Sequence, residues 1–351
     1  MEIEKSSALK KGIPLLLLGL FVFLLYTYFF VGFTDFVNIF RLVDPFFYSL
    51  SFTAFLLSMT FYSLTWWELL RVLSVETAFR RPFLFTWVGA FVDLLIPAES
   101  VSGEVSRAYL MHKDSSENAG KIVASVVSHR ILSMATTLGG LIVGSTLFIV
   151  RYEPSELVVS FILIVAVGTA LSLFLLIYLS LKKEATKRVV KWLVNLIGRL
   201  FKGRLKIARL SSKVSRMLKE FHKGIEILGA RPRKLVLPIG YSVLAWLFDL
   251  SIAFFVFLAL PLPVQVRFSA IVIVYSIVVA VQTIPLGIPG EVGVIEIVMA
   301  TLYRLLLPGI PPATIAAATI LIRALTLWVK LVISGVAVQW VGFKMLKGEV
   351  L

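Results

Sequence analysis

Residues 284–292 read IPLGIPGEV, and residues 96–105 carry a similar string, IPAESVSGEV. Both begin with Ile-Pro and reach Gly-Glu-Val a few residues later, and each follows an apolar segment. Proline lacks a backbone N–H and glycine has no side chain to restrict it, so both interrupt helices. Interruptions in matching parts of two halves of a chain point to a midplane binding site in transporters. The sequence therefore predicts a weak internal repeat with broken helices around a central site.

The apolar segments around these strings predict the number of membrane crossings, each of which needs about 20 residues. Two short segments, 82–96 and 292–307, reach only roughly 22–24 Å at 1.5 Å per residue, less than a hydrocarbon core of about 30 Å. We expect half-helices that turn back there, or a short tilted span at 292–307. The prediction is an all-α polytopic membrane protein with about seven or eight spanning helices and one or two re-entrant half-helices. The full-length candidates are 13–33, 45–67, 122–150, 157–181, 235–260, 268–285 and 313–341.

The composition of the chain excludes several classes of protein. Of its 351 residues 59% are hydrophobic and 16% charged, whereas soluble domains average about 45–50% and 25%. A soluble enzyme, a coiled coil, a disordered chain and a disulfide scaffold are therefore excluded. There is no cysteine, and the three histidines lie far apart, so we expect no metal site and no cofactor.

The positive charge of the chain is concentrated in residues 182–234, which hold 17 basic and 3 acidic residues, a net charge of 17 − 3 = +14 out of +15. Apolar residues recur there at helical spacing, which predicts two amphipathic helices on an anionic membrane surface. Basic loops favour the cytoplasm, so the N-terminus and this segment should be cytoplasmic in the cell membrane. We expect one transmembrane domain, 1–351, with halves at 12–181 and 235–341, and no binding of nucleic acid. The C-terminus would be cytoplasmic if 292–307 crosses the membrane and external if it turns back.

Charged residues inside the apolar segments indicate a polar interior. Each costs about 2.5–3.5 kcal/mol if it faces lipid, so these residues must face each other or a wet cavity. The set is Asp93, Arg130, Asp249, Glu291, Glu296 and Arg323, and Lys330 either joins it or snorkels. For Asp249, simple pairing with a neighbouring arginine is the main alternative to a functional role.

The arginines among them favour an anionic ligand. Arg130 and Arg323 lie about 14–15 Å into their spans at 1.5 Å per residue. Arginine binds phosphate through paired donors, and helix N-termini also attract anions. Because the surrounding walls are apolar, we expect a phosphate-headed lipid. The expected binding residues are Glu104, Arg107, Arg130, Gly290, Glu291, Glu296 and Arg323, supported by Gly103, His129, Asp249, Pro285, Pro289 and Gly293.

These motifs resemble those of the lysylphosphatidylglycerol synthase transmembrane-region family, also described as flippase-like integral membrane proteins. The resemblance runs from about Gly12 to Val341. Two departures are His129, where the family has an acid before the arginine, and Glu291, where a second glycine is common. The matching residues are Pro97, Gly103, Glu104, Arg107, Ala108, Tyr109 and Leu110, then Arg130, the string at 285–296 and Arg323.

The resemblance implies a membrane part that handles lipid, without the soluble catalytic domain to which such regions are fused in the synthases. Our first interpretation is a lipid flippase or transporter and not an enzyme, with proton coupling through Glu104, Glu291 or Glu296 conceivable. The alternative is a non-catalytic partner that presents lipid to a separate glycosyltransferase or aminoacyltransferase, with 182–234 as its docking surface. An intramembrane enzyme is disfavoured because the sequence has no clear catalytic motif.

Overall fold

The computed structural model describes residues 38, 41–96, 101–152, 154–200, 207–261, 266–284 and 287–347, with 193, 195–200, 207–213 and 344–347 as backbone only. The expected span 13–33 and the prolines Pro97 and Pro285 lie outside these ranges. The described chain folds into helices and contains no strand. The all-α polytopic architecture is therefore confirmed.

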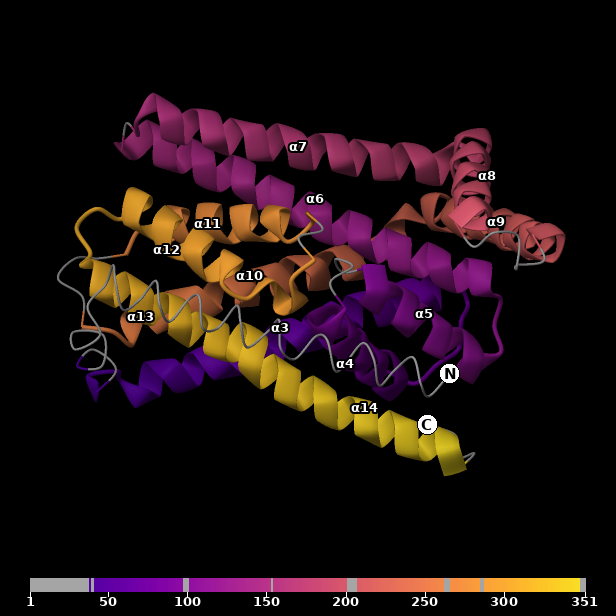
Figure 1. The fold of residues 1–351 in the computed structure, drawn as a ribbon, viewed down its shortest axis with the longest axis horizontal. Coiled ribbons are helices and arrows are strands. Elements are labelled where there is room, and N and C mark those ends of the chain that lie inside the picture. Colours follow the sequence, from indigo (N-terminus) through magenta and orange to yellow (C-terminus); the bar gives the residue numbers. More distant parts are fainter. Residues whose placement is uncertain are drawn as a thin grey trace.

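Five of the described helices are long and apolar enough to cross a membrane. They run along the long axis of the molecule, as Figure 1 shows. These apolar segments form helices because lipid offers no hydrogen-bond partners, and a helix satisfies its own backbone N–H and C=O groups. These are α3 (Pro45–Val72), α6 (Ala119–Tyr152), α7 (Glu156–Leu181), α10 (Val236–Leu258) with the preceding 3₁₀ turn η1 (Pro232–Leu235), and α13 (Pro312–Arg323) continued by η3 (Ala324–Val329) and α14 (Lys330–Lys347).

Helices α4 (Arg80–Leu95) and α5 (Val101–Ser115) pack against each other as a short hairpin. An ion pair of 3.0 Å between Arg81 Nη1 and Asp114 Oδ2 joins the open ends of the hairpin, so the chain returns to the side from which it came. At the tip, Asp93 Oδ1 accepts hydrogen bonds from the Gly103 N–H at 2.6 Å and the Ser102 hydroxyl at 2.8 Å. The first of the two expected half-helices therefore does turn back.

Gly89 of α4 and Gly103 of α5 face each other and allow the hairpin to close. A Cβ atom at Gly103 would overlap the Gly89 carbonyl oxygen and the Asp93 carboxylate, whereas one at Gly139 in α6 would meet nothing within 4 Å. We expect Gly103→Ala to destabilise the protein by about 1–3 kcal/mol, the usual cost of overpacking. The control Gly139→Ala should be neutral or slightly stabilising, because alanine favours a helix. Thermal unfolding of both variants in the same detergent measures this, and equal stability would mean that the hairpin is not closely packed.

A second hairpin corrects the expected full span at 268–285. Helix α11 (Phe268–Val281) is only 14 residues long, about 21 Å at 1.5 Å per residue. The chain then reverses through the 3₁₀ turn η2 (Pro289–Glu291) and continues as α12 (Val294–Leu306), which packs against α11. The reversal depends on backbone in the left-handed region at Gly290 (φ 59°) and Gly293 (φ 89°), which glycine adopts readily.

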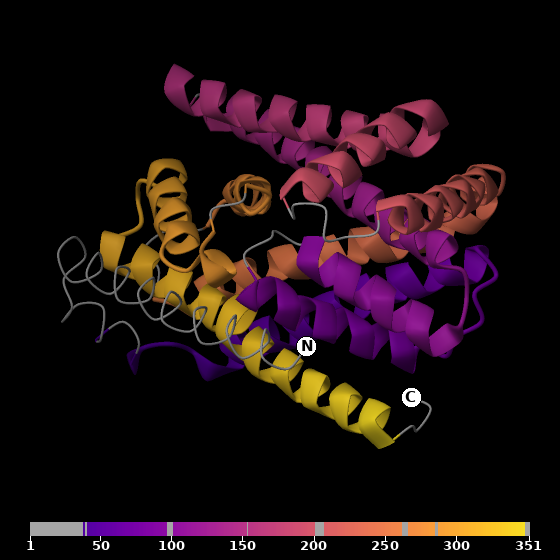
Figure 2. The same ribbon diagram turned by 45° about the vertical axis from the view of Figure 1, so that its right-hand side comes forward.

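The two hairpins enter from opposite ends of the molecule and their tips meet in the middle (Figures 1 and 2). Residues of α4 contact η2 directly. The C-terminal end of α14 lies at the end of the molecule that also carries α8 (Lys183–Leu200) and α9 (Ile207–Gly229). We expected a re-entrant 292–307 to place the C-terminus on the other side. That inference was wrong, because α11 and α12 enter and return together.

The basic segment forms the two expected helices, α8 and α9. Helix α9 packs against the start of α6, where Gly120 lies against Met217 and Phe221 and Gly224 lies against Ala124. Helix α8 lies across the end of α7 (Figure 1). Lys183 Nζ lies 2.6 Å from Glu226 Oε1, and this contact lowers the pKa of the exposed Glu226 carboxyl.

Candidate functional site

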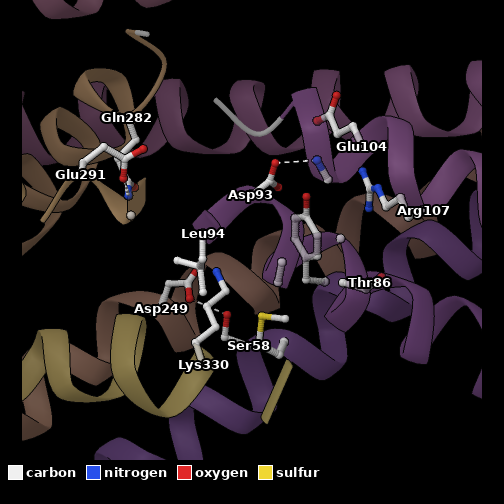
Figure 3. A pocket seen from close by; sticks show the side chains of 16 residues that line it. Ser58, Thr86, Asp93, Leu94, Glu104, Arg107, Asp249, Gln282, Glu291 and Lys330 are labelled. Carbon is white, nitrogen blue, oxygen red and sulfur yellow. Dashed lines mark hydrogen bonds between the residues drawn. The ribbon is translucent and has the colours of Figure 1, made fainter. Parts of the chain in front are cut away.

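A cavity of about 260 Å³ lies where the tips of the two hairpins meet. Both Gly-Glu pairs of the repeated strings line it, Gly103 with Glu104 and Gly290 with Glu291. Figure 3 shows the lining side chains around this space. The remaining lining residues are Ser58, Met59, Tyr62, Thr86, Gly89, Ala90, Asp93, Leu94, Arg107, Asp249, Gln282 and Lys330.

Arg107, on α5, is the buried cation of this cavity. It is 3% exposed, and its Nη1 lies 2.9 Å from His129 Nδ1. The guanidinium also lies over the ring of Trp66, 4.9 Å from its centroid. Because arginine stays charged, His129 Nδ1 must accept this hydrogen bond. No hydrogen-bond partner is found for Arg107 Nε or Nη2 within the described part of the chain.

The unpartnered nitrogens of Arg107 need an explanation, because a buried donor without a partner costs about 1–3 kcal/mol and more when it is charged. A guanidinium fork with two free nitrogens is suited to the oxygens of a phosphate or carboxylate. Both nitrogens are closed off from solvent in this arrangement, so an anion in the cavity would supply the missing acceptors once neighbouring side chains move aside.

Glu104 lines the cavity one helical turn before Arg107. Arg130 of α6 lies beside the Glu104 carboxylate. The distance between Arg130 Nη1 and Glu104 Oε1 is 3.7 Å, and both side chains are mostly buried. Arg130 is not among the residues that line the cavity. In this arrangement it offsets the charge of Glu104 instead of presenting donors to the cavity.

Arg323 and Glu296 form a buried ion pair beside the second hairpin tip. Arg323 Nε donates to Glu296 Oε1 at 2.7 Å, and its Nη2 donates to the Gly290 carbonyl oxygen at 2.7 Å. The other carboxylate oxygen of Glu296 accepts from the Gly293 N–H at 2.7 Å. Both side chains lie outside the cavity lining. This pair ties α12, η2 and α13 together and fixes the Gly290 and Glu291 backbone.

Asp249 lines the cavity from α10. It accepts hydrogen bonds from the Ser58 hydroxyl at 2.5 Å and the Tyr275 hydroxyl at 2.8 Å. The structure thus holds Asp249 with hydroxyl groups, where the sequence suggested an arginine as the alternative. At the second tip, Gln282 Nε2 donates to Glu291 Oε2 at 3.1 Å.

Six polar residues of the cavity were not among the predicted binding residues: Ser58, Tyr62, Thr86, Asp93, Gln282 and Lys330. A signal for Lys330 was its position two helical turns after Arg323, at membrane depth. The intervening π-helical segment η3 determines where it points, and no sequence pattern announces such a segment. In the described chain, no group of three or more His, Asp or Glu side chains is placed to hold a metal ion.

Comparison with known proteins places the chain among membrane proteins. The sequence model of the family described as "Lysylphosphatidylglycerol synthase TM region" matches residues 16–334. A UPF0104 membrane protein of Methanothermobacter thermautotrophicus is 23% identical over 310 residues, covering 86% of this chain and 87% of that protein. UPF0104 membrane proteins of Pyrococcus horikoshii (22% identity; 82% and 85% covered) and Methanocaldococcus jannaschii (23%; 88% and 89%) are also similar.

Proposed function

Because the chain belongs to the lysylphosphatidylglycerol synthase TM region family, we propose that it binds the phosphate-bearing head group of a membrane lipid in its central cavity and moves that lipid between the two leaflets. The family supports a role connected with membrane lipid. The phosphate group and the movement between leaflets are inferred from the cavity.

The observation that carries the proposal is the pair of unpartnered nitrogens on Arg107, a side chain 3% exposed at the wall of the cavity. A lipid phosphate would accept from both nitrogens and would compensate a buried positive charge. The acyl chains would stay against the apolar helix surfaces that face the bilayer.

The opposed hairpins suggest how such a lipid would pass. The tip of α4–α5 and the tip of α11–α12 approach the cavity from opposite ends of the molecule. Broken helices around a midplane site allow one half to move against the other, so that the site opens to alternate sides. Each hairpin would then close the cavity from one side.

The proposed orientation follows the distribution of basic residues. Helix α8 lies at one end of the molecule and its lysines and arginines up to Lys191 are exposed, and basic segments next to membrane spans favour the cytoplasm. We therefore place the 182–234 segment, the N-terminus and the end of α14 on the cytoplasmic side of the cell membrane.

The test is mass spectrometry of the lipids that remain bound after purification in mild detergent. Wild type should be enriched in one phosphate-bearing lipid class, and Arg107→Gln should lose that enrichment. Arg304→Gln is the matched control, because Arg304 is exposed on α12 and lies outside the cavity lining. If all three proteins retain the same mixture of lipids, with no phosphate-bearing class enriched, the proposal is contradicted.

A second function is favoured by the basic helix α8, whose Lys187, Arg188 and Lys191 are exposed. Such a surface could dock an acidic partner, for example a glycosyltransferase or aminoacyltransferase that receives lipid from the cavity. Transport by the purified protein alone supports the first function. Arg107-dependent lipid retention without transport supports the second.

A further inference from the structure

The cavity lining carries a second cation, Lys330, together with the carboxylates of Asp249 and Asp93 (Figure 3). Lys330 is the first residue of α14, directly after the π-helical segment η3. Asp249 comes from α10 and Asp93 from the tip of the first hairpin. Three elements far apart in the sequence therefore bring one ammonium and two carboxylates to the same space.

Lys330 is not committed to either carboxylate. Its charge interacts with both Asp249 and Asp93, but no hydrogen bond or ion pair of its Nζ is found among the described residues. Both carboxylates already have other donors. Asp249 accepts from Ser58 and Tyr275, and Asp93 accepts from the tip of α5. The long, flexible lysine side chain is thus free to turn toward a ligand.

The formal charge of the cavity lining is negative. Four carboxylates and two cations line it, which gives 2 − 4 = −2 when all are ionised. An anionic head group would make this −3, in a space of low dielectric where repulsion is strong. The groups around Asp249 that can titrate or carry charge are Tyr62 of α3, Asp93 of α4, Tyr275 of α11 and Lys330 of α14, with Glu104, Arg107 and Glu291 on the rest of the lining.

We propose that Asp249 and Asp93 form a proton site coupled to the lipid site, and that one proton enters with each anionic head group. When the phosphate enters, Lys330 turns from the two carboxylates to the phosphate. The carboxylates lose their compensating charge, and one of them takes a proton from water. When the lipid leaves, Lys330 returns and the proton is released. The head group brings one negative charge and the proton one positive charge, so the charge of the cavity does not change.

This inference rests on the proposed function, and pH-dependent binding separates the two. The probe is dihexanoyl phosphatidylglycerol, a soluble phosphodiester with one constant negative charge, titrated calorimetrically into the full-length protein in detergent. The bound state holds more protons than the free state, so affinity should fall as the pH rises. The fall for uptake of one proton is about tenfold per pH unit once the carboxylates are ionised in the free protein. Buffers of different ionisation enthalpy should reveal the same proton uptake directly.

Three variants and one control make the test specific. Asp249→Asn or Asp93→Asn should flatten the pH dependence of binding, according to which of the two carboxylates takes the proton. Lys330→Gln should also flatten it and weaken binding, because no ammonium is left to turn from the carboxylates to the phosphate. Arg304→Gln should behave as wild type. Binding by wild type that shows neither pH dependence nor proton uptake would overturn the proton site and leave the lipid site intact. No binding of the probe by wild type would overturn the proposed function, and this inference with it.

Discussion

Replacement of Arg107 by glutamine should weaken the binding of dihexanoyl phosphatidylglycerol about 10- to 150-fold. Hydrogen bonds to charged groups contribute about 1.5–3 kcal/mol, which corresponds to this range in the dissociation constant. Glutamine keeps a polar side chain but loses the charge and the two-pronged donor set that the structure leaves unpartnered. Calorimetric titration of wild type and variant in the same detergent measures the effect.

Two comparisons separate recognition from folding at this position. Arg107→Lys keeps the charge but presents a single point donor, so it should recover only part of the affinity. Thermal unfolding should be recorded for both variants, because Arg107 also stacks on Trp66 and contacts His129. An Arg107→Gln protein that folds normally and binds the probe as wild type would contradict the assignment of the cavity as a phosphate site.

Replacement of Arg323 by methionine should lower the free energy of unfolding by about 3–5 kcal/mol. Removal of one partner of a buried ion pair leaves the other charge uncompensated, which produces losses of this size. Glu296 would remain buried without its cation, and the Gly290 carbonyl oxygen would lose its donor. Thermal unfolding in detergent should show a large decrease in midpoint.

The double variant Glu296→Gln/Arg323→Met tests whether the pair acts as a unit. Because the uncompensated charge is gone, the double variant should be more stable than Arg323→Met alone. The glutamine oxygen can still accept from the Gly293 N–H. Additive losses from the two single changes would contradict the role of the pair as the anchor of the second hairpin tip.

The sequence predicted the helical architecture because apolar length and composition determine what can cross a bilayer. The long helices α3, α6, α7 and α10 lie where the apolar segments predicted them. The repeated Pro-Gly-Glu strings were a valid signal as well, since Glu104 and Glu291 meet at one cavity. Interrupted helices and buried charges are both unfavourable in contact with lipid. In this fold the two hairpin tips and four buried or half-buried carboxylates lie around the same cavity, away from lipid.

The roles of individual arginines could not be predicted, because partner choice depends on tertiary packing. Arg323 satisfies Glu296 and a carbonyl oxygen, and Arg130 stands behind Glu104. Only Arg107 among these arginines lines the cavity. The length of α11 was misjudged because the apolar segment was extended to residue 285. The helix ends at Val281, directly before Gln282 and Thr283, and backbone in the left-handed region at Gly287, Gly290 and Gly293 then reverses the chain.

The most direct measurement is transbilayer movement of a fluorescent phosphatidylglycerol in vesicles that contain the purified protein. Dithionite destroys the fluorophore in the outer leaflet alone, so protein-mediated movement increases the fraction of fluorescence that is lost. Vesicles with wild type or Arg304→Gln should lose more fluorescence than protein-free vesicles, and vesicles with Arg107→Gln should match the protein-free ones. Equal losses with wild type, with Arg107→Gln and without protein would contradict the account.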